Sequence, residues 1–259
     1  MSKSKLNIGI AGAGIAGLVA GTELQRAGHQ VSIFESSSRT GGRIQSMEVG
    51  GLLVESGPEF IHGNQKETLG LLKKYHIKYD LINGKMYSAR DGALRETYEM
   101  AEGWDQLLDK MNSLERDQPF QEFLEKSFMG NHFKELKKSA IRFAEGFDLA
   151  DTSEASTKAL LAEWKHEEAG QYRIPAGYGT LTFSIENEFK NLTGKIFLNH
   201  GVESVEWNSG GLRISVNGHK IFNMDKLIIS LPLSLLNKTA PPLESIVFRP
   251  SLEEKQKAF

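Results

Sequence analysis

Three glycines near the start of the chain place the strongest constraint on its fold. Gly12, Gly14 and Gly17 lie in the stretch "NIGIAGAGIAGLVAGTEL", which has no charged residue before Glu23. A glycine-rich turn of this spacing, placed between a strand and a helix, binds a dinucleotide diphosphate through backbone amides and the helix dipole. A secretory signal peptide and a membrane span are the other readings that such an apolar opening allows.

The flanking residues disfavour both of those alternatives. A signal peptide would use Lys3 and Lys5 ahead of the apolar run. A signal peptide does not explain the spacing of the glycines, and Glu23 and Arg26 follow the apolar run without a convincing cleavage site. A membrane span needs roughly 20 apolar residues. Only 16 uncharged ones run from Asn7 to Thr22.

The residues around the glycines predict a complete β-α-β unit. We expect a buried strand over Leu6–Ile10, a helix over Ile15–Ala27 that Gly28 ends, and a second strand over "HQVSIFE". The second strand ends at Glu35. This order of elements is that of a Rossmann-like α/β domain.

Each of these positions has a role in dinucleotide binding. Gly12 permits a tight turn, Gly14 lets the diphosphate approach the backbone, and Gly17 lets helix and strand pack closely. Glu35 can accept hydrogen bonds from ribose hydroxyls, and its charge would repel the extra phosphate of NADP. The opening therefore predicts a dinucleotide site.

A loop rich in arginine and glycine follows directly. In "SSSRTGGRIQS", Arg39 and Arg43 flank the pair Gly41–Gly42. Glycines let a loop fold against a cofactor, and arginine can bind a phosphate through two parallel hydrogen bonds. Alone, the loop reads as a solvated surface segment; after a β-α-β unit, it predicts a second anchor on one ligand.

These motifs resemble the FAD-dependent amine oxidase family, which includes monoamine and polyamine oxidases. The resemblance is carried by "GAGIAG", Glu35, "RTGGR" and "LLVESGPEFIHG", and it returns at "FLNHGVESVEW" and "LIISLPLSLL". It implies bound FAD and hydride transfer from the carbon beside an amine nitrogen to the flavin, with oxygen as acceptor. Carotenoid desaturases and protoporphyrinogen oxidases share "RTGGR", and Rab GDP-dissociation inhibitors share the fold, so both classes remain alternatives.

The resemblance also implies which residues contact FAD. The glycine turn would hold the diphosphate, Glu35 the adenosine ribose and Arg43 the phosphate region, while Val202 would contact adenine through its backbone. Residues 57–60 would lie close to the flavin ring. The implied set is Gly12, Gly14, Ala16, Gly17, Glu35, Gly42, Arg43, Gly57, Pro58, Glu59, Phe60 and Val202. The family's active-site lysine is expected in a C-terminal half that this chain does not show, so no catalytic residue is assigned.

The chain is predicted to contain three segments. Residues 1–85 form the first FAD-binding segment, 86–172 a mainly helical, partial substrate domain, and 173–259 the returning FAD-binding segment. A hairpin is predicted over "IQSMEVGGLLVESG", and short strands between glycine turns near the end predict a small antiparallel sheet. Asp151–Glu154 has the spacing of a helix-start capping arrangement. A purely structural helical cap is the alternative to a substrate domain.

Composition bears on partners and location. The chain has 259 residues, a net charge of -2 and no cysteine, which gives no reason to expect nucleic acid, disulfides or a thiolate metal site. We expect a cytoplasmic protein that acts on a small-molecule amine, without membrane segment or metal. Such oxidases run to roughly twice this length. The C-terminal half is therefore expected in trans or lost by truncation, and a true short relative of the family is the third alternative.

Residues that suggest other chemistry have simpler explanations. His62 could bind substrate or tune the flavin, but a polar packing role is favoured. The acidic residues Glu163, Glu167 and Glu168 around His166 suggest metal ligands, but a solvated helix face explains them better. Ser184 lacks a nucleophile-elbow context. Three tryptophans are interpreted as core or interface residues: Trp104, Trp164 and Trp207.

Overall fold

Most of the chain is described by a computed structural model, which covers residues 4–90, 92–97, 101–167, 170–209, 211–217, 220–236 and 246–252. Two compact units emerge, and each is described by itself. Unit 1 comprises Met1–Glu59, Glu67–Tyr79 and Ile174–Phe259, and unit 2 comprises Phe60–Lys66 and Asp80–Arg173. The division of the chain into FAD-binding and substrate segments stays a prediction.

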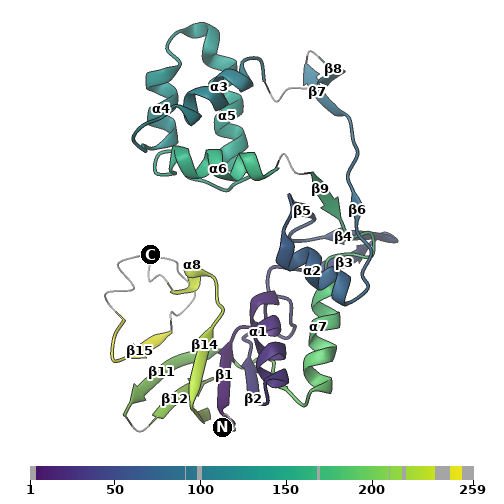
Figure 1. Cartoon of the computed structure of the whole chain (residues 1–259), viewed down its shortest axis with the longest axis vertical. Helices are drawn as coiled ribbons and strands as arrows, with labels where there is room; N and C mark the ends of the chain where they lie inside the picture. Colours follow the sequence, from purple (N-terminus) through teal and green to yellow (C-terminus); the bar gives the residue numbers. More distant parts are fainter. Residues whose placement is uncertain are drawn as a thin grey trace. The chain divides into compact units, whose positions relative to one another are not determined.

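A four-stranded parallel sheet forms the centre of unit 1 (Figure 1). Its order is β10-β2-β1-β14, and every neighbouring pair is parallel. Parallel strands are covered on both faces, which explains why the apolar runs of the two central strands are buried throughout. The strands are β1 (Asn7–Ala11), β2 (Gln30–Phe34), β10 (Lys195–Phe197) and β14 (Lys226–Ile229).

Two long helices pack together beside this sheet. Gly21 of α1 lies so close to Phe189 of α7 and Ile33 of β2 that an added Cβ would approach each to 3.0 Å. Gly28, with φ of 91°, follows α1 as predicted. The helices of unit 1 are α1 (Ile15–Arg26), α7 (Gly179–Asn191), the short α8 (Leu233–Leu236) and α2 (Lys66–Lys74), which belongs to the unit from Glu67 onward.

A mainly antiparallel sheet returns the chain to the parallel one, as predicted. Its order is β13-β12-β11-β15, and β14 follows β13 directly. Phe34 joins the two sheets, since its ring stacks on Phe197 and meets Phe222 edge-on at a centroid distance of 4.7 Å. The strands are β11 (Val202–Asn208), β12 (Gly211–Val216), β13 (Lys220–Met224) and β15 (Val247–Arg249).

The hairpin predicted after the arginine loop is also present. It pairs β3 (Ser46–Val49) with β4 (Leu52–Glu55). Gly50 and Gly51 form its turn with φ of 59° and 79°, the left-handed values that a two-residue turn of type I′ requires.

Unit 2 combines small sheets with a helical bundle. A three-stranded sheet has the order β5-β9-β6, and β7 pairs with β8 in a separate hairpin. These strands are β5 (Phe60–His62), β6 (Asp80–Leu81), β7 (Met86–Arg90), β8 (Ala93–Thr97) and β9 (Gln171–Arg173). The helices are α3 (Trp104–Asn112), α4 (Phe120–Ser127), the 3-10 turn η1 (Asn131–Phe133), α5 (Lys134–Gly146) and α6 (Thr157–Glu167).

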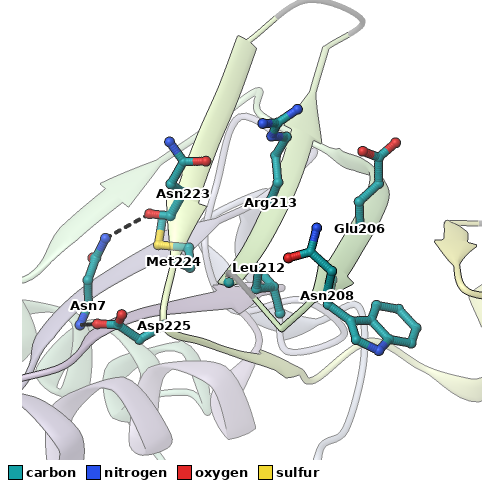
Figure 2. A pocket seen from close by; sticks show the side chains of 10 residues that line it. Asn7, Glu206, Asn208, Leu212, Arg213, Asn223, Met224 and Asp225 are labelled. Atoms are coloured by element: carbon teal, nitrogen blue, oxygen red, sulfur yellow. Dashed lines mark hydrogen bonds between the residues drawn. The ribbon is translucent and has the colours of Figure 1, made fainter.

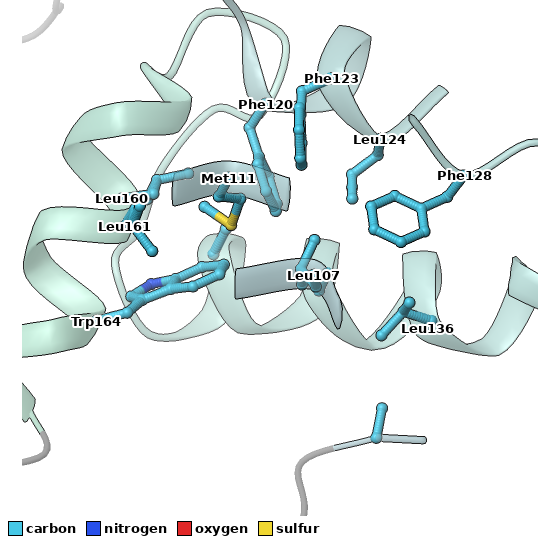
Figure 3. Packing of buried hydrophobic residues seen from close by; sticks show 13 residues of the cluster. Leu107, Met111, Phe120, Phe123, Leu124, Phe128, Leu136, Leu160, Leu161 and Trp164 are labelled. Atoms are coloured by element: carbon cyan, nitrogen blue, oxygen red, sulfur yellow. The ribbon is translucent and has the colours of Figure 1, made fainter. Parts of the chain in front are cut away.

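The helices of unit 2 close around an aromatic core (Figure 3). Phe120 and Phe123 are buried, and Trp164 stacks against Trp104 at a centroid distance of 5.4 Å. The Trp164 indole donates a hydrogen bond to the Asp148 carboxylate at 2.8 Å. Trp164 is therefore a core residue and the partly buried Trp104 packs against the same core, in line with the interpretation from the sequence.

The start predicted for the last helix of this bundle was wrong. The Asp151 carboxylate accepts hydrogen bonds from the amide and hydroxyl of Ser153 within a turn. Helix α6 begins later, at Thr157, where the Ser156 hydroxyl accepts the amide hydrogen of Ala159 at 2.9 Å. The capping role therefore belongs to a serine outside the predicted stretch.

Among the helices that the structure describes, none is both long and apolar enough to cross a membrane.

Glu188 on α7 ties three helices of unit 1 together. Its carboxylate pairs with the Arg26 guanidinium of α1, lies 3.4 Å from the Lys74 ammonium of α2, and accepts the Tyr75 hydroxyl proton at 2.5 Å. Burial opposes ionisation of Glu188, but the Tyr75 hydrogen bond and the two cations outweigh it, so the pKa of Glu188 is lowered.

Replacing Glu188 by glutamine is expected to lower the free energy of unfolding of unit 1 by about 1 kcal/mol at pH 7, since the carboxylate is partly solvent-screened. A lowered folded-state pKa means that this stabilisation is complete above the ordinary value of 4.5 and is lost as pH falls through the folded value. Amide hydrogen exchange of α1 and α7 against pH measures it. Glu122→Gln, which breaks an exposed pair with Lys126, should change stability by less than about 0.5 kcal/mol.

Candidate cofactor-binding site

The turn between β1 and α1 excludes side chains at two positions. Gly12 has φ of 101°, a left-handed value, and donates its amide hydrogen to the Phe34 carbonyl at 2.8 Å. At Gly17 an added Cβ would lie 2.1 Å from the Gly12 carbonyl oxygen. Real Cβ atoms do not approach an oxygen so closely, so α1 can begin against this turn only with glycine there.

The N-terminus of α1 faces open space. Gly14 precedes the helix in an extended conformation, no side chain caps the first turn, and that turn contains no acidic residue. A Cβ added at Gly14 would meet no atom within 4 Å. Ala16, in the first turn, is exposed. Uncapped amides with a positive dipole end and free space above them suit an anion such as a diphosphate.

Glu35 is held against the glycine turn. One carboxylate oxygen accepts the amide hydrogen of Ala13 at 2.8 Å. The other accepts the amide and the hydroxyl of Ser37, each at 2.9 Å. The side chain is half-buried, and an ionised carboxylate has about four acceptor positions. The Ser36 hydroxyl is a fourth donor, at 3.3 Å, whereas the Ser37 hydroxyl can donate to the Arg39 carbonyl instead, at 2.7 Å. A ligand hydroxyl that binds Glu35 would therefore take the place of a serine hydroxyl.

The arginine loop packs on the same turn through backbone atoms. Gly41 donates its amide hydrogen to the Ala13 carbonyl at 2.9 Å and forms a bridge with Gly14. A Cβ added at Gly42 would come within 3.2 Å of the Gly14 Cα. The predicted residues Gly14 and Gly42 are thus in direct proximity.

The two arginines of this loop have different roles. Arg39 donates to the carbonyls of Thr40, Gly42 and Ile44 at 3.0, 2.7 and 3.1 Å, and so closes the loop on itself. Arg43 is exposed, and its guanidinium makes no hydrogen bond or ion pair with the residues that the structure describes. Arg43 is therefore the arginine available to a ligand.

Val202 lies beside the Glu35 segment. Glu35 donates its amide hydrogen to Phe197 at 2.9 Å and accepts that of His200 on its carbonyl at 2.7 Å. A Cβ added at Gly201 would lie 3.2 Å from the Ser36 Cβ. Val202, which begins β11, is thereby brought near the acid although 167 residues separate the two in sequence.

The predicted run 57–60 is only partly placed with these residues. Gly57 packs on the arginine loop so tightly that an added Cβ would lie 2.0 Å from the Arg43 carbonyl oxygen. Pro58 and Glu59 follow it in unit 1, whereas Phe60 begins β5 of unit 2. The structure therefore groups Gly57 with Arg43 and describes Phe60 in the other unit.

Ser230 is a residue of this site that sequence reasoning missed. It follows β14, and its hydroxyl donates to the carbonyls of Ala11 and Gly12 at 3.0 and 3.1 Å. An added Cβ at Gly17 would also meet this hydroxyl, at 2.7 Å. The only sequence signal was its place at the end of a returning strand, in "LIISLPLSLL".

A separate pocket of about 490 Å³ lies at the opposite end of β1 (Figure 2). Asn7 donates its amide hydrogen to the Asp225 carboxylate at 2.7 Å and its side-chain amide to the Asn223 carbonyl at 2.9 Å. Trp207 and Arg213 also line it. None of the predicted cofactor residues borders this pocket.

Unit 2 contains a cavity of about 510 Å³ beside His62. Phe147 meets the His62 ring edge-on at 4.8 Å, and Asp148 and Glu163 line the same cavity. Burial lowers the pKa of His62 and raises that of Asp148. Burial therefore favours the neutral form of His62, and its packing role stays a prediction.

Most of the possible metal ligands around His166 lie outside the residues that the structure describes. The side chains of His166 and Glu167, and all of Glu168, are among the residues that the structure does not describe. Within the described stretches, no three His, Cys, Asp or Glu side chains gather as a metal site would require.

The turn yields a matched pair of glycine variants. Gly17→Ala should cost about 3 kcal/mol in the free energy of unfolding because its methyl group collides with backbone. Gly14→Ala should change stability by less than about 0.5 kcal/mol, since its φ of -69° suits alanine and the space is open. Urea unfolding curves of the two variants test this, and equal midpoints would contradict the geometry.

Comparisons with known proteins converge on one family. The model of the family described as flavin containing amine oxidoreductase matches residues 15–136 and 107–259. Lysine-specific histone demethylase 1 homolog 2 of Arabidopsis thaliana is 26% identical over 96% of this chain and 35% of its own length. The 4,4'-diapolycopen-4-al dehydrogenase of Metabacillus indicus is 27% identical over 77% of this chain and 50% of its own.

Solved structures share the fold of this chain. The structure of a redesigned putrescine oxidase superposes with a TM-score of 0.76 at 19% identity. The match covers 98% of the present chain and 63% of the putrescine oxidase chain. The chain spans about a third of the length of the histone demethylases that it matches. With the family model covering nearly its whole length, the chain belongs to the flavin-containing amine oxidoreductase family.

Proposed function

We propose that this chain binds FAD and forms part of an enzyme that oxidises an amine, with oxygen as the final acceptor. The bound FAD would supply the redox chemistry by accepting a hydride from the carbon beside the amine nitrogen. Unit 1 would hold the cofactor, and unit 2 would form part of the substrate domain. No residue of this chain is assigned a catalytic role.

The contact between Glu35 and the glycine turn carries the cofactor proposal. It places a fixed carboxylate beside uncapped helix amides. Ribose hydroxyls donate hydrogen bonds and a diphosphate accepts them, so the two neighbouring groups complement the two halves of an adenosine diphosphate. Gly14 and Ala16 would border the diphosphate, and Val202 would contact the adenine.

The arginine loop would extend these cofactor contacts toward the flavin. Gly42 lies against Gly14, and the free guanidinium of Arg43 follows immediately. A guanidinium forms two parallel hydrogen bonds with a phosphate and offsets its charge. Gly57, packed on the Arg43 backbone, would bring Pro58, Glu59 and Phe60 toward the ring.

Similarity to putrescine oxidase supports an amine as the substrate, because putrescine is a diamine. A second candidate is oxidation of a polyene such as a polyene aldehyde, supported by the match to the 4,4'-diapolycopen-4-al dehydrogenase over 77% of this chain. The residues proposed to bind FAD are equally suited to both reactions. The substrate that reduces the flavin distinguishes them.

Two charge variants test the cofactor contacts. Glu35→Gln should weaken FAD binding roughly 10- to 100-fold, because a charged acceptor for the ribose hydroxyls is lost. Arg43→Gln should weaken it by about 10-fold and reduce its dependence on salt. Flavin fluorescence titration measures both. Arg213→Gln, another exposed arginine of unit 1, is the control and should bind as wild type does.

Anaerobic flavin reduction tests the reaction itself. Protein purified with its flavin and any attached polypeptide should lose its visible flavin absorption when mixed with a primary amine or a polyamine. Reduction by polyenes alone would instead support the second candidate. A colourless protein that takes up no FAD would reject both and favour a binding protein of the GDP-dissociation-inhibitor type.

A further inference from the structure

The β3–β4 hairpin carries four of its five large exposed apolar side chains on one side; the fifth, Leu53, pairs with Glu48 on the other face. Residues directly opposite each other in a hairpin share a face. Met47 pairs with Val54 and Val49 pairs with Leu52. These four residues are here called the hairpin apolar face. Their exposed fractions are 36% for Met47, 41% for Val54, 55% for Val49 and 70% for Leu52.

The other face of the hairpin is already used within unit 1. The Ser46 hydroxyl accepts the amide hydrogen of Gly179 at 2.8 Å, and the Glu55 carboxylate accepts that of Tyr178 at 2.7 Å. Both donors lie at the start of α7. The polar face is therefore fixed to a helix N-terminus, and the hairpin cannot rotate to bury its apolar face there.

The hairpin is packed on one face only. A two-stranded hairpin is at best marginally stable in water, and natural edge strands usually carry charged residues or proline that discourage pairing. Between Met47 and Val54 the only charged residue is Glu48. Neither strand pairs with any further strand in the described part of the chain.

The face is too small to be a homodimer interface by itself. Four residues per strand span about 13 Å, and the two strands lie about 5 Å apart. A stable association of separate proteins buries about 800 Å² on each partner. The size of the face suits packing inside a domain, where a neighbouring element of the same fold completes the layer.

A second edge of unit 1 is incomplete in the same way. Strand β14 ends the parallel sheet, and within the described residues it pairs only with β1. Its Leu227, Ile228 and Ile229 are half-buried, whereas β1 and β2 are buried almost throughout. Parallel sheets are normally covered on both faces and flanked by further elements.

We propose that the hairpin apolar face is the docking surface for the part of the amine oxidoreductase fold that this chain does not span. The putrescine oxidase match leaves more than a third of that fold without a counterpart here, since 63% of it is covered. The occupant is the polypeptide that carries this remaining part, continuous with the chain or separate from it. This inference rests on family membership and not on the amine chemistry.

The absence of cysteine from the sequence makes a direct test possible. Leu52→Cys places a single thiol on the hairpin apolar face, and Asn191→Cys places one at the exposed end of α7 as the matched control. Each variant is prepared as the isolated 259-residue chain and, from the altered native gene, as the native assembly. Maleimide labelling rates are compared, and circular dichroism checks that the variants fold.

We expect the Leu52→Cys thiol to react at least 10-fold more slowly in the native assembly than in the isolated chain, with the Asn191→Cys rate unchanged. A benzophenone maleimide on the same thiol should cross-link to a peptide that matches the amine oxidoreductase family outside residues 1–259. Equal labelling rates, a cross-link within a second copy of residues 1–259, a cross-link to an unrelated protein, or none would overturn the proposal. Flavin reduction by amines is measured separately, so failure here leaves that test untouched.

Discussion

The close contact between α1 and the turn after β1 is the constraint on which the rest of unit 1 depends. Gly17 brings the helix against the Gly12 carbonyl, where any side chain would collide. Ser230 donates to that carbonyl from the end of β14, so the turn is fixed from two directions. Because the helix begins there, its unpaired amides open at the carboxyl edge of the parallel sheet, where α/β folds bind their ligands.

Charge around the turn is arranged by hydrogen bonds that fix one group and leave another free. Glu35 would repel a phosphate if it could move over the helix N-terminus, but the amides of Ala13 and Ser37 hold it to one side. The Arg39 guanidinium donates its hydrogen bonds to carbonyls of its own loop. That closed loop presents Arg43 to solvent beside Gly42. The site would thus separate an acceptor for hydroxyls from donors for phosphate, as the proposed binding of an adenosine diphosphate requires.

What the sequence could predict was local. The β1–α1–β2 unit, the hairpin and the returning sheet follow from apolar periodicity and glycine turns within a few residues of one another. Ser230 was missed because its partner Gly12 is 218 residues away, and no spacing rule links such positions. The same holds for Glu188, which joins α7 to residues of α1 and α2. Phe60 follows Glu59 in sequence, yet contacts assign it to unit 2.

The two units differ in how far they complete their own packing. In unit 2, the helices turn Phe120, Phe123 and Trp164 inward, and each is almost fully buried. In unit 1, the hairpin uses its polar face to hold α7 and leaves Leu52 outside. Burying a side chain of that kind stabilises a fold by about 1.5–3 kcal/mol, so a neighbour that covers the hairpin would also stabilise the loop preceding it. That loop carries Gly42 and Arg43, and Gly57, which follows the hairpin, packs on the Arg43 carbonyl, so we expect covering of the hairpin to favour the loop conformation proposed to bind the cofactor.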